Sequence, residues 1–255
     1  MSLPEAAIAC AHIVERGDPL RFRTVMAAPV ASRAPLFALY AFNVEVARAP
    51  WVTQEAMIAE MRLQWWRDAL EEIAEGRPVR SHEVTTPLAE ALSPETAAML
   101  DQLVAARRWD IYRDAFEDEA HFDAYINETA GHLMWASAMS LGAPATAEHA
   151  VRDLAYAAGV AAFLRAVPAL ADAGRIPLLD GTPDGVRALA KRAQQRLVRP
   201  KVPSSARPAL WPAIGARATL KQAMRDPMAV ADNRLSQGVP PARLSASALT
   251  GRLWL

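Results

Sequence analysis

Three regularly spaced aspartates are the first residues in this sequence that could do chemistry. Asp110, Asp114 and Asp118 occur four residues apart in "WDIYRDAFED". On a helix this spacing puts three carboxylates on one face, and carboxylate oxygens are ligands that Mg²⁺ prefers. Solvated helices often carry such rows, and three arginines lie close by in the sequence. We therefore expect a surface feature here rather than a metal site.

The histidines and the single cysteine offer no catalytic alternative. The five histidines are scattered, without metal-ligand spacing or the order of a Ser/His/Asp triad. No Cys/His pair has the spacing of a zinc site. Cys10, as the only cysteine, excludes an internal disulfide and is typical of a reducing compartment. We expect a cytoplasmic protein with no metal and no other cofactor.

A second group of polar residues lies in "FALYAFNVEVARAP", residues 37–50, which reads as an apolar helix ending at Pro50. Asn43, Glu45 and Arg48 interrupt a face that is otherwise apolar. Because an unpaired buried charge is costly, we expect Glu45 or a neighbouring acid to pair with Arg48. In the alternative, Arg48 lies near the helix end and reaches solvent or the last carbonyls.

A basic block follows in the last third of the chain. Residues 185–225 contain ten Lys or Arg and no acid, although the net charge of the whole chain is zero. Apolar residues recur at helical spacing in "DGVRALAKRAQQRLVR", which predicts a basic amphipathic helix. It could be a core-packed helix with a solvated face, or a face that binds anionic lipid or an acidic partner. The candidate residues of this face are Arg187, Lys191, Arg192, Arg196 and Arg199. We expect no nucleic-acid binding, because no recognition motif accompanies the charge.

The elements that would position these residues all read as helices. Helical patterns cover residues 37–50, 53–75, 93–116, 121–142 and 146–174, with Thr53 and Ser93 as predicted N-caps. Alternating strand patterns are absent, so the predicted fold class is all-α. Pro-rich segments 198–208 and 227–241 read as loops or an extended tail. We predict one helical domain over residues 1–226 and a C-terminal tail over residues 227–255.

The composition is typical of a folded globular protein. With 52% hydrophobic residues, a chain of 255 residues can bury a large core. The N-terminal residues lack the basic start of a signal peptide, so we expect none. The longest apolar run, residues 154–164, is well short of the roughly 20 residues that a membrane span requires. We expect no membrane-spanning segment.

Five blocks in order carry a family resemblance. They are "MAAPVASRAPLFALYAF", "QWWRDALEEIAEGRP", "LVAARRWDIY", "FDAYINETAGHLMWASAMSLGA" and "AYAAGVAAFLRAVPALADAGRIPL". Over residues 18–226 the sequence resembles the squalene/phytoene synthase family. This resemblance implies an isoprenoid-synthase-type helical bundle around a central cavity. It also implies enzymes that join prenyl diphosphates with Mg²⁺ held by two aspartate-rich motifs.

The residues at those motif positions depart from the family pattern. The first motif falls on Val44, Ala47, Arg48 and Trp51, and the second on Ala162, Arg165, Ala166 and Leu170. Only Arg165 is retained. A cation and apolar groups cannot replace Mg²⁺ ligands, so we expect no prenyl-diphosphate ionisation. The predicted occupants of the former active-site cavity are Tyr40, Asn43, Glu45, Arg48 and Arg165, and we expect an acid to pair with Arg165.

The blocks "AFNVE", "MRLQWWRDALEEI" and "LRAVP" are similar to one non-catalytic branch of the family, typified by a mitochondrial respiratory complex I assembly factor. This similarity implies a pseudoenzyme that acts as an assembly factor or scaffold for complex I. Its partner would be a complex I subunit or assembly intermediate. Its place would be the cytoplasm, peripheral to the inner face of the cytoplasmic membrane.

Two alternatives remain at this stage. The first is an isoprenoid- or quinone-binding module, in which small residues of 157–162 leave room for a lipid tail. Alternatively, the bulky side chains of Trp51 and Leu170 could fill the cavity. The second is a prenyl-diphosphate synthase with a rewired site. Trp65, Trp66, Trp109 and Trp135 could line a ligand pocket, but aromatic residues at helical spacing are more often core.

Overall fold

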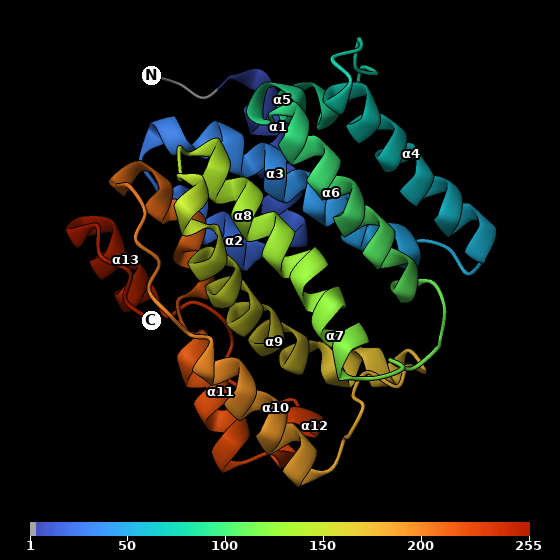
Figure 1. Cartoon of the computed structure of the whole chain (residues 1–255), viewed down its shortest axis with the longest axis vertical. Coiled ribbons are helices and arrows are strands. Elements are labelled where there is room, and N and C mark those ends of the chain that lie inside the picture. Colours follow the sequence, from blue (N-terminus) through green and yellow to red (C-terminus); the bar gives the residue numbers. More distant parts are fainter. Residues whose placement is uncertain (1–3) are drawn as a thin grey trace.

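The computed structural model describes residues 4–255, and every regular element in that range is helical (Figure 1). The α-helices of the first half are α1 (Glu5–Gly17), α2 (Pro19–Met26), α3 (Val30–Arg48), α4 (Ala56–Ala74), α5 (Thr85–Ala91) and α6 (Pro94–Ala106). Those of the second half are α7 (Glu119–Ile126), α8 (His132–Ser140), α9 (Glu148–Asp172), α10 (Pro183–Gln195), α11 (Ala216–Arg225), α12 (Met228–Ala231) and α13 (Pro241–Thr250). Short 3-10 helices are η1 (Ala49–Trp51), η2 (Arg107–Asp110), η4 (Ala145–Ala147) and η5 (Ser204–Ala213), and η3 (Asn127–Gly131) is a π-helical segment. The all-α prediction is confirmed.

Helices α3, α8 and α9 form the centre of the bundle. Residues 36–44 of α3 are buried without interruption, as expected for a helix that neighbours surround on all sides. Helix α1 packs against α3, α4 packs against α6, and α8 contacts both α3 and α9. In Figure 1 the α4–α6 pair covers one side of this centre, while α10, α11 and α12 form the opposite end of the molecule.

Helix α9 requires a correction to the sequence analysis. Together with η4 it forms a segment, residues 145–172, that is long and apolar enough to cross a membrane by length and composition. The sequence argument considered only uninterrupted apolar runs and missed it. More than half of its most apolar window is buried inside the fold (56%), as in the core helix of a globular protein. Packing in the bundle therefore accounts for its apolar composition.

The predicted helix 93–116 is shorter in the structure. It begins as predicted, with the Ser93 side chain accepting a hydrogen bond from the backbone N–H of Thr96. It then gives way to η2 and an irregular segment, because Arg175 donates hydrogen bonds to the carbonyls of Trp109 and Asp110. The three aspartates of the opening motif therefore do not share a helical face. Asp118 instead accepts a hydrogen bond from the His121 N–H at the start of α7.

Two other helices differ in detail. The predicted helix 53–75 begins at Ala56, and the Thr53 hydroxyl accepts a hydrogen bond from the Glu55 N–H without capping α4. The predicted helix 121–142 runs through α7 and α8 but is interrupted by η3. A π-helical turn widens the backbone locally and is often found next to functional sites.

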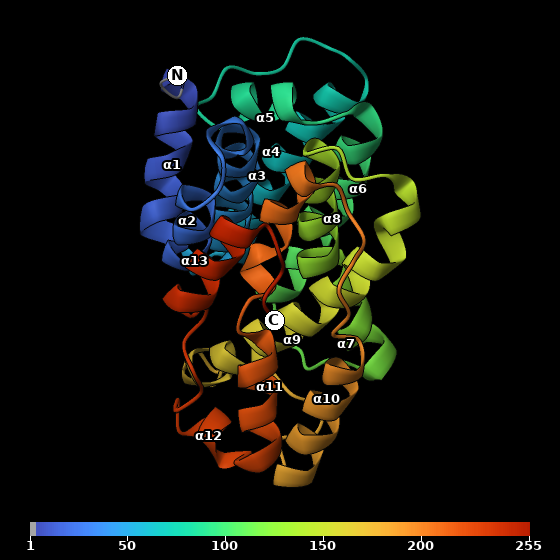
Figure 2. The ribbon, with the colours of Figure 1, turned by 90° about the vertical axis from the view of Figure 1, so that its left-hand side faces the viewer.

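The C-terminal part is more ordered than its proline content suggests. Segment 204–213 is the 3-10 helix η5, and its first half overlaps the predicted loop 198–208. Residues 227–255 contain α12 and α13, and Val239 and Leu244 join Trp211 and Ile214 in a small apolar cluster. Figure 2 shows α10, α11 and α12 at one end of the molecule and α1 and α5 at the other. The proposed division of the chain at residue 226 stays a prediction.

Candidate functional site

A cavity of about 580 Å³ lies in the bundle between α2, α3, α8 and α9. Its longest wall is the face of α9 that carries Ala158, Ala162, Ala166 and Ala169, at intervals of three or four residues. Such intervals align side chains along one face of a helix, and methyl groups there leave the space open. Of the small residues predicted to leave room, Ala158, Gly159 and Ala162 line the cavity. Ala157 and Ala161 are buried in packing instead.

The positions of both family motifs meet at this cavity. Six of the eight motif positions line it, namely Ala47, Trp51, Ala162, Arg165, Ala166 and Leu170. The first two come from α3 and η1, and the other four from α9. Trp51 and Leu170 form part of the wall without filling the space. The sequence thus predicted which two segments face each other across the cavity.

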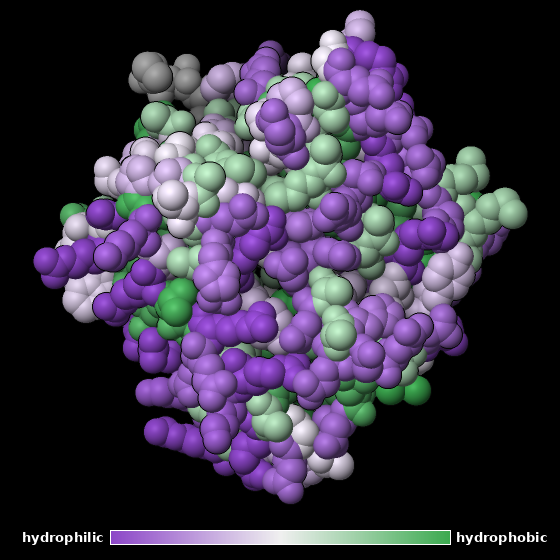
Figure 3. Space-filling view, in the orientation of Figure 1, coloured by the Kyte–Doolittle hydropathy of each residue, from purple (hydrophilic) through white to green (hydrophobic). Residues whose placement is uncertain are grey.

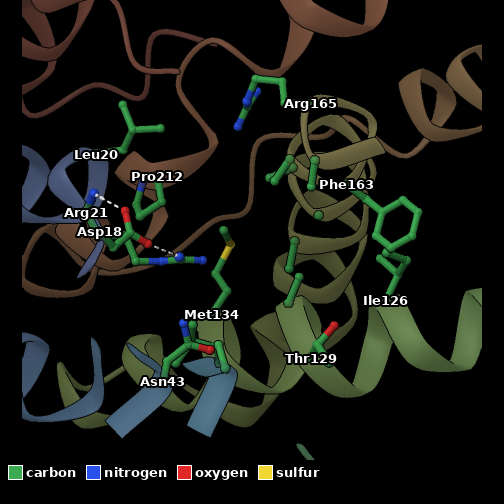
Figure 4. A pocket seen from close by; sticks show the side chains of 18 of the residues that line it. Asp18, Leu20, Arg21, Asn43, Ile126, Thr129, Met134, Phe163, Arg165 and Pro212 are labelled. Carbon is green, nitrogen blue, oxygen red and sulfur yellow. Dashed lines mark hydrogen bonds and ion pairs between the residues drawn. The ribbon is translucent and has the colours of Figure 1, made fainter. Parts of the chain in front are cut away.

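One polar cluster lies where the α1–α2 junction faces α9. The Asp18 carboxylate accepts hydrogen bonds from the backbone N–H and the guanidinium of Arg21, at 2.9 and 2.5 Å. The Arg21 guanidinium carbon lies 5.4 Å from the ring centre of Tyr40. Burial raises the pKa of the Tyr40 hydroxyl to about 12, so this group stays protonated. Figure 4 shows the Asp18–Arg21 pair and Arg165 entering the same space from different elements.

Arg165 has an unusual environment within this cluster. Its Nη1 donates to the buried Thr219 hydroxyl at 3.2 Å, and no carboxylate of residues 4–255 lies within 4.0 Å of it. Burial lowers the pKa of Arg165, nearby Arg21 lowers it further, and Asp18 opposes the shift. The expected ion pair to Arg165 is therefore wrong, although the side chain lies in the cavity wall and not in bulk water.

A second polar cluster closes another part of the cavity. The Arg107 guanidinium donates to Asp110 Oδ2 at 3.1 Å and to the Tyr125 hydroxyl at 3.0 Å. The Tyr125 hydroxyl in turn donates to Asp110 Oδ1 at 3.0 Å. Burial, aided by Asp110, raises the pKa of Tyr125 above its usual range, so its hydroxyl remains a donor. Asp110 is consequently half of a buried ion pair, a role that its regular spacing in the sequence did not reveal.

Two predicted cavity residues lie outside the cavity. Glu45 and Arg48 pair with each other at 3.7 Å, and the Arg48 side chain is 63% exposed. Both parts of the expectation for Arg48 therefore hold, since it pairs with Glu45 and also reaches solvent. Tyr40 and Asn43 do line the cavity. The Asn43 amide forms no side-chain hydrogen bond within residues 4–255, which leaves its polar atoms directed at the open space.

The predicted basic face is partly neutralised. Arg187 pairs with Asp184, and Arg192 pairs with Glu119 and Asp123. Arg196 stacks over the Tyr156 ring at 4.2 Å. Lys191 and Arg199 are exposed, and neither forms an ion pair within the part of the chain that the structure describes. In Figure 3 the lower part of the molecule, where α10 and α11 lie, is mainly hydrophilic.

The cavity does not offer the ligands that Mg²⁺ requires. Among residues 4–255, no group of three or more His, Cys, Asp or Glu is placed to hold a metal ion. Asp18 and Asp110 are the acids in the cavity wall, and each is paired with an arginine. Trp65, Trp66, Trp109 and Trp135 lie outside the cavity wall, in agreement with their interpretation as packing residues.

The arrangement of helices around one central cavity defines an isoprenoid-synthase-type fold. A dehydrosqualene synthase solved in complex with a ligand superposes with a TM-score of 0.76, covering 97% of this chain and 95% of that one at 17% identity. The squalene synthase HpnC from Alicyclobacillus acidocaldarius gives a TM-score of 0.69, covering 86% and 93% at 18% identity. Residues 14–178 match the family model described as squalene/phytoene synthase. The chain belongs to the squalene/phytoene synthase family.

The curated proteins that are similar to this chain in sequence are not described as synthases. A Drosophila melanogaster protein described as a homologue of NADH dehydrogenase (ubiquinone) complex I, assembly factor 6 is 31% identical over 199 residues, covering 75% of this chain and 58% of that one. The Homo sapiens assembly factor 6 is 28% identical over 162 residues, covering 62% and 48%. The chain therefore spans about half the length of the curated relatives it matches.

Proposed function

We propose that this chain is a non-catalytic member of its family that serves as an assembly factor or scaffold for respiratory complex I. The similarity to complex I assembly factors over up to three quarters of the chain carries this proposal. The partner would be a complex I subunit or an assembly intermediate. The site of action would be a membrane surface, in line with the place of complex I itself.

The chemistry of the cavity supports the non-catalytic part of the proposal. Ionising a prenyl diphosphate requires neutralisation of the departing diphosphate, which Mg²⁺ on carboxylate ligands supplies in this family. Here the aspartate positions of both motifs carry alanine, arginine, tryptophan and leucine. The two carboxylates that remain in the wall are committed to Arg21 and Arg107. Neither acid can ligate a metal without leaving a partly buried arginine unpaired, which is costly.

The exposed cations of the C-terminal half support a peripheral membrane location. Lys191, Arg199, Lys201 and Lys221 are exposed and form no ion pair within the described residues. Anionic headgroups attract such side chains by about 1 kcal/mol each near a membrane surface. We infer that this region, or an acidic partner bound to it, holds the protein beside the membrane in which complex I is built.

Two measurements on the full chain test the proposal. The tagged protein, purified from gently solubilised membranes of its source organism, should carry complex I subunits or subassemblies identified by mass spectrometry. Its absence from all such assemblies would contradict the assembly role. Incubated with farnesyl or geranylgeranyl diphosphate and Mg²⁺, the purified chain should release no diphosphate, whereas an active squalene synthase serves as positive control. Mg²⁺-dependent release would contradict the non-catalytic assignment.

A further inference from the structure

The charges in the cavity wall do not cancel. The charged residues of the wall are Asp18, Arg21, Arg107, Asp110 and Arg165. Asp18 pairs with Arg21, and Asp110 pairs with Arg107, so the positive charge of Arg165 remains. A half-buried guanidinium with a single hydroxyl partner is costly, because an unpaired charge loses most of its hydration. The cavity thus retains one uncompensated positive charge.

The free donors of Arg165 face the open space. Its Nη1 donates to Thr219, whereas Nε and Nη2 have no hydrogen-bond partner within residues 4–255. Neither atom is among the buried polar atoms sealed off without a partner. Both atoms are therefore accessible to solvent, and Arg165 lines the cavity, where the fork geometry of a guanidinium suits the two oxygens of a carboxylate or phosphate. Asn43, across the cavity, offers a second free polar group (Figure 4).

Much of the remaining wall, along α9, is apolar. From Arg165 the cavity continues along the small residues of α9 toward Ile126, Leu133 and Phe163. A cavity of about 580 Å³ lies in the range of roughly 300–1,000 Å³ that holds single small molecules. We propose that this cavity binds, without any metal ion, a single-chain amphiphile whose monoanionic head group pairs with Arg165 and whose apolar tail lies along α9.

The charge balance separates this ligand from two others. A diphosphate carries more negative charge than the single uncompensated arginine can neutralise, and the residues present do not hold the Mg²⁺ that would balance it. A neutral quinone would leave the Arg165 charge uncompensated. A long-chain carboxylate, taken up free or released from membrane lipid, matches both the charge and the apolar wall. This inference does not depend on the proposed role in complex I assembly.

The test is a fluorescence titration of the full chain with cis-parinarate, a fluorescent long-chain carboxylate, in the presence of EDTA. We expect saturable binding and displacement by oleate. Oleyl alcohol, which has a similar tail without the charge, should displace the probe about tenfold less well or worse, because a charge-assisted hydrogen bond is lost. Acetate, which has no tail, should not displace it. Farnesyl diphosphate without Mg²⁺ should bind more weakly than oleate.

Matched variants locate the site. Arg165→Met keeps an unbranched side chain but removes the charge, and should weaken oleate binding about tenfold or more while sparing oleyl alcohol. Arg48→Met, an exposed arginine outside the cavity, should bind like the wild type. Ala162→Phe fills the space beside α9 and should abolish binding of both compounds. Thermal unfolding of each variant checks that its fold is intact.

Each contrary outcome overturns the proposal. It fails if the wild-type chain does not bind cis-parinarate, or binds it only after Mg²⁺ is added. It fails equally if oleate and oleyl alcohol displace the probe alike, or if folded Arg165→Met binds oleate as the wild type does. Mass spectrometry of the ligand extracted from the purified chain identifies the carboxylate and its chain length.

Discussion

Arg165 and the residues around it show what happens to a cavity when its metal ligands are replaced. Alanines at three of the other motif positions, Ala47, Ala162 and Ala166, keep the space open, while Arg165 keeps its position and finds only Thr219 as a partner. An arginine in this setting costs stability, and its loss to an apolar residue should leave the fold at least as stable. The retention of such a group is typical of binding sites, where stability is often traded for function.

His132 gives a prediction for the dependence of stability on pH. Burial lowers the pKa of His132 from 6.5 to about 4, and Arg152 adds to this shift. Arg152 donates to Nδ1 at 2.8 Å, and Nε2 faces Gln102 at 2.9 Å, so the neutral ring fits the site. Between about pH 6.5 and 4 the unfolded chain binds more protons at this residue, so the free energy of unfolding falls as pH falls, by up to about 3 kcal/mol.

Urea unfolding between neutral pH and pH 4 measures this effect. His132→Gln should flatten part of the decline, because the group that titrates differently in the two states is gone. His149→Gln is the matched control, since the His149 side chain is 94% exposed. An unchanged pH dependence in His132→Gln would show that other groups cause the decline.

At the level of single residues, the sequence predicted where a residue lies in the fold better than it predicted the hydrogen-bond or ion-pair partners of that residue. The spacing of Ser93 and Pro94 predicted a capped helix start, and the family pattern placed Ala162 and Arg165 at the cavity. The partner of Arg165, Thr219 in α11, and the second partner of Asp110 beside Arg107, Tyr125 in α7, come from other elements. Because those contacts depend on how helices cross, no local pattern predicts them.

At the scale of elements, the contact between α9 and η3 shapes the cavity. Gly159 lets the two segments approach, since a Cβ atom there would lie 2.7 Å from the Cβ of Ala130 and 2.9 Å from a methyl group of Ile126. Gly159→Ala should force these segments apart. Overpacking of this kind costs about 1–3 kcal/mol, and it should also change the cavity that both segments line.

Denaturant unfolding compares this variant with Gly181→Ala, where an added Cβ meets nothing within 4 Å. We expect a clear loss of stability in Gly159→Ala and little change in Gly181→Ala. If both variants unfold at the wild-type midpoint, η3 can shift freely and does not fix the shape of the cavity.

The helices themselves were predictable from periodicity, but their interruptions were not. The predicted helix 93–116 ends early because Arg175, after α9, binds the carbonyls of Trp109 and Asp110. Stacking of Trp109 on Phe116, with ring centres 4.2 Å apart, holds the irregular segment in place. The π-helical segment η3 likewise lies beside Gly159 of a distant helix. Each interruption follows from tertiary packing that overrides local propensity.

At the scale of the whole molecule, the uneven distribution of charge gives a prediction about membranes. Reversal of Lys191, Arg199, Lys201 and Lys221 to glutamate should lower binding to phosphatidylglycerol vesicles at least about tenfold, because each cation contributes about 1 kcal/mol. Binding of the wild type should also weaken as salt rises. The basic block was visible in the sequence, but which cations are neutralised by Asp184, Glu119 and Asp123 was not.

A vesicle sedimentation assay measures this binding, and a variant with an equal change in charge is its control. In that control, four exposed arginines outside the basic region are replaced by glutamate: Arg23, Arg62, Arg243 and Arg252. None of them forms an ion pair within residues 4–255. It should retain more vesicle binding than the first variant. Equal loss in both variants would mean that net charge alone, and not this region, determines membrane attachment.

The measurement that tests the central claim most directly is the amount of assembled complex I, with its NADH:quinone oxidoreductase activity, in membranes of the source organism. The gene is deleted and then restored, and the assembled complex is resolved on native gels. We predict that deletion lowers both assembled complex and activity, and that the wild-type gene restores them. Normal assembly and activity after deletion would contradict the account.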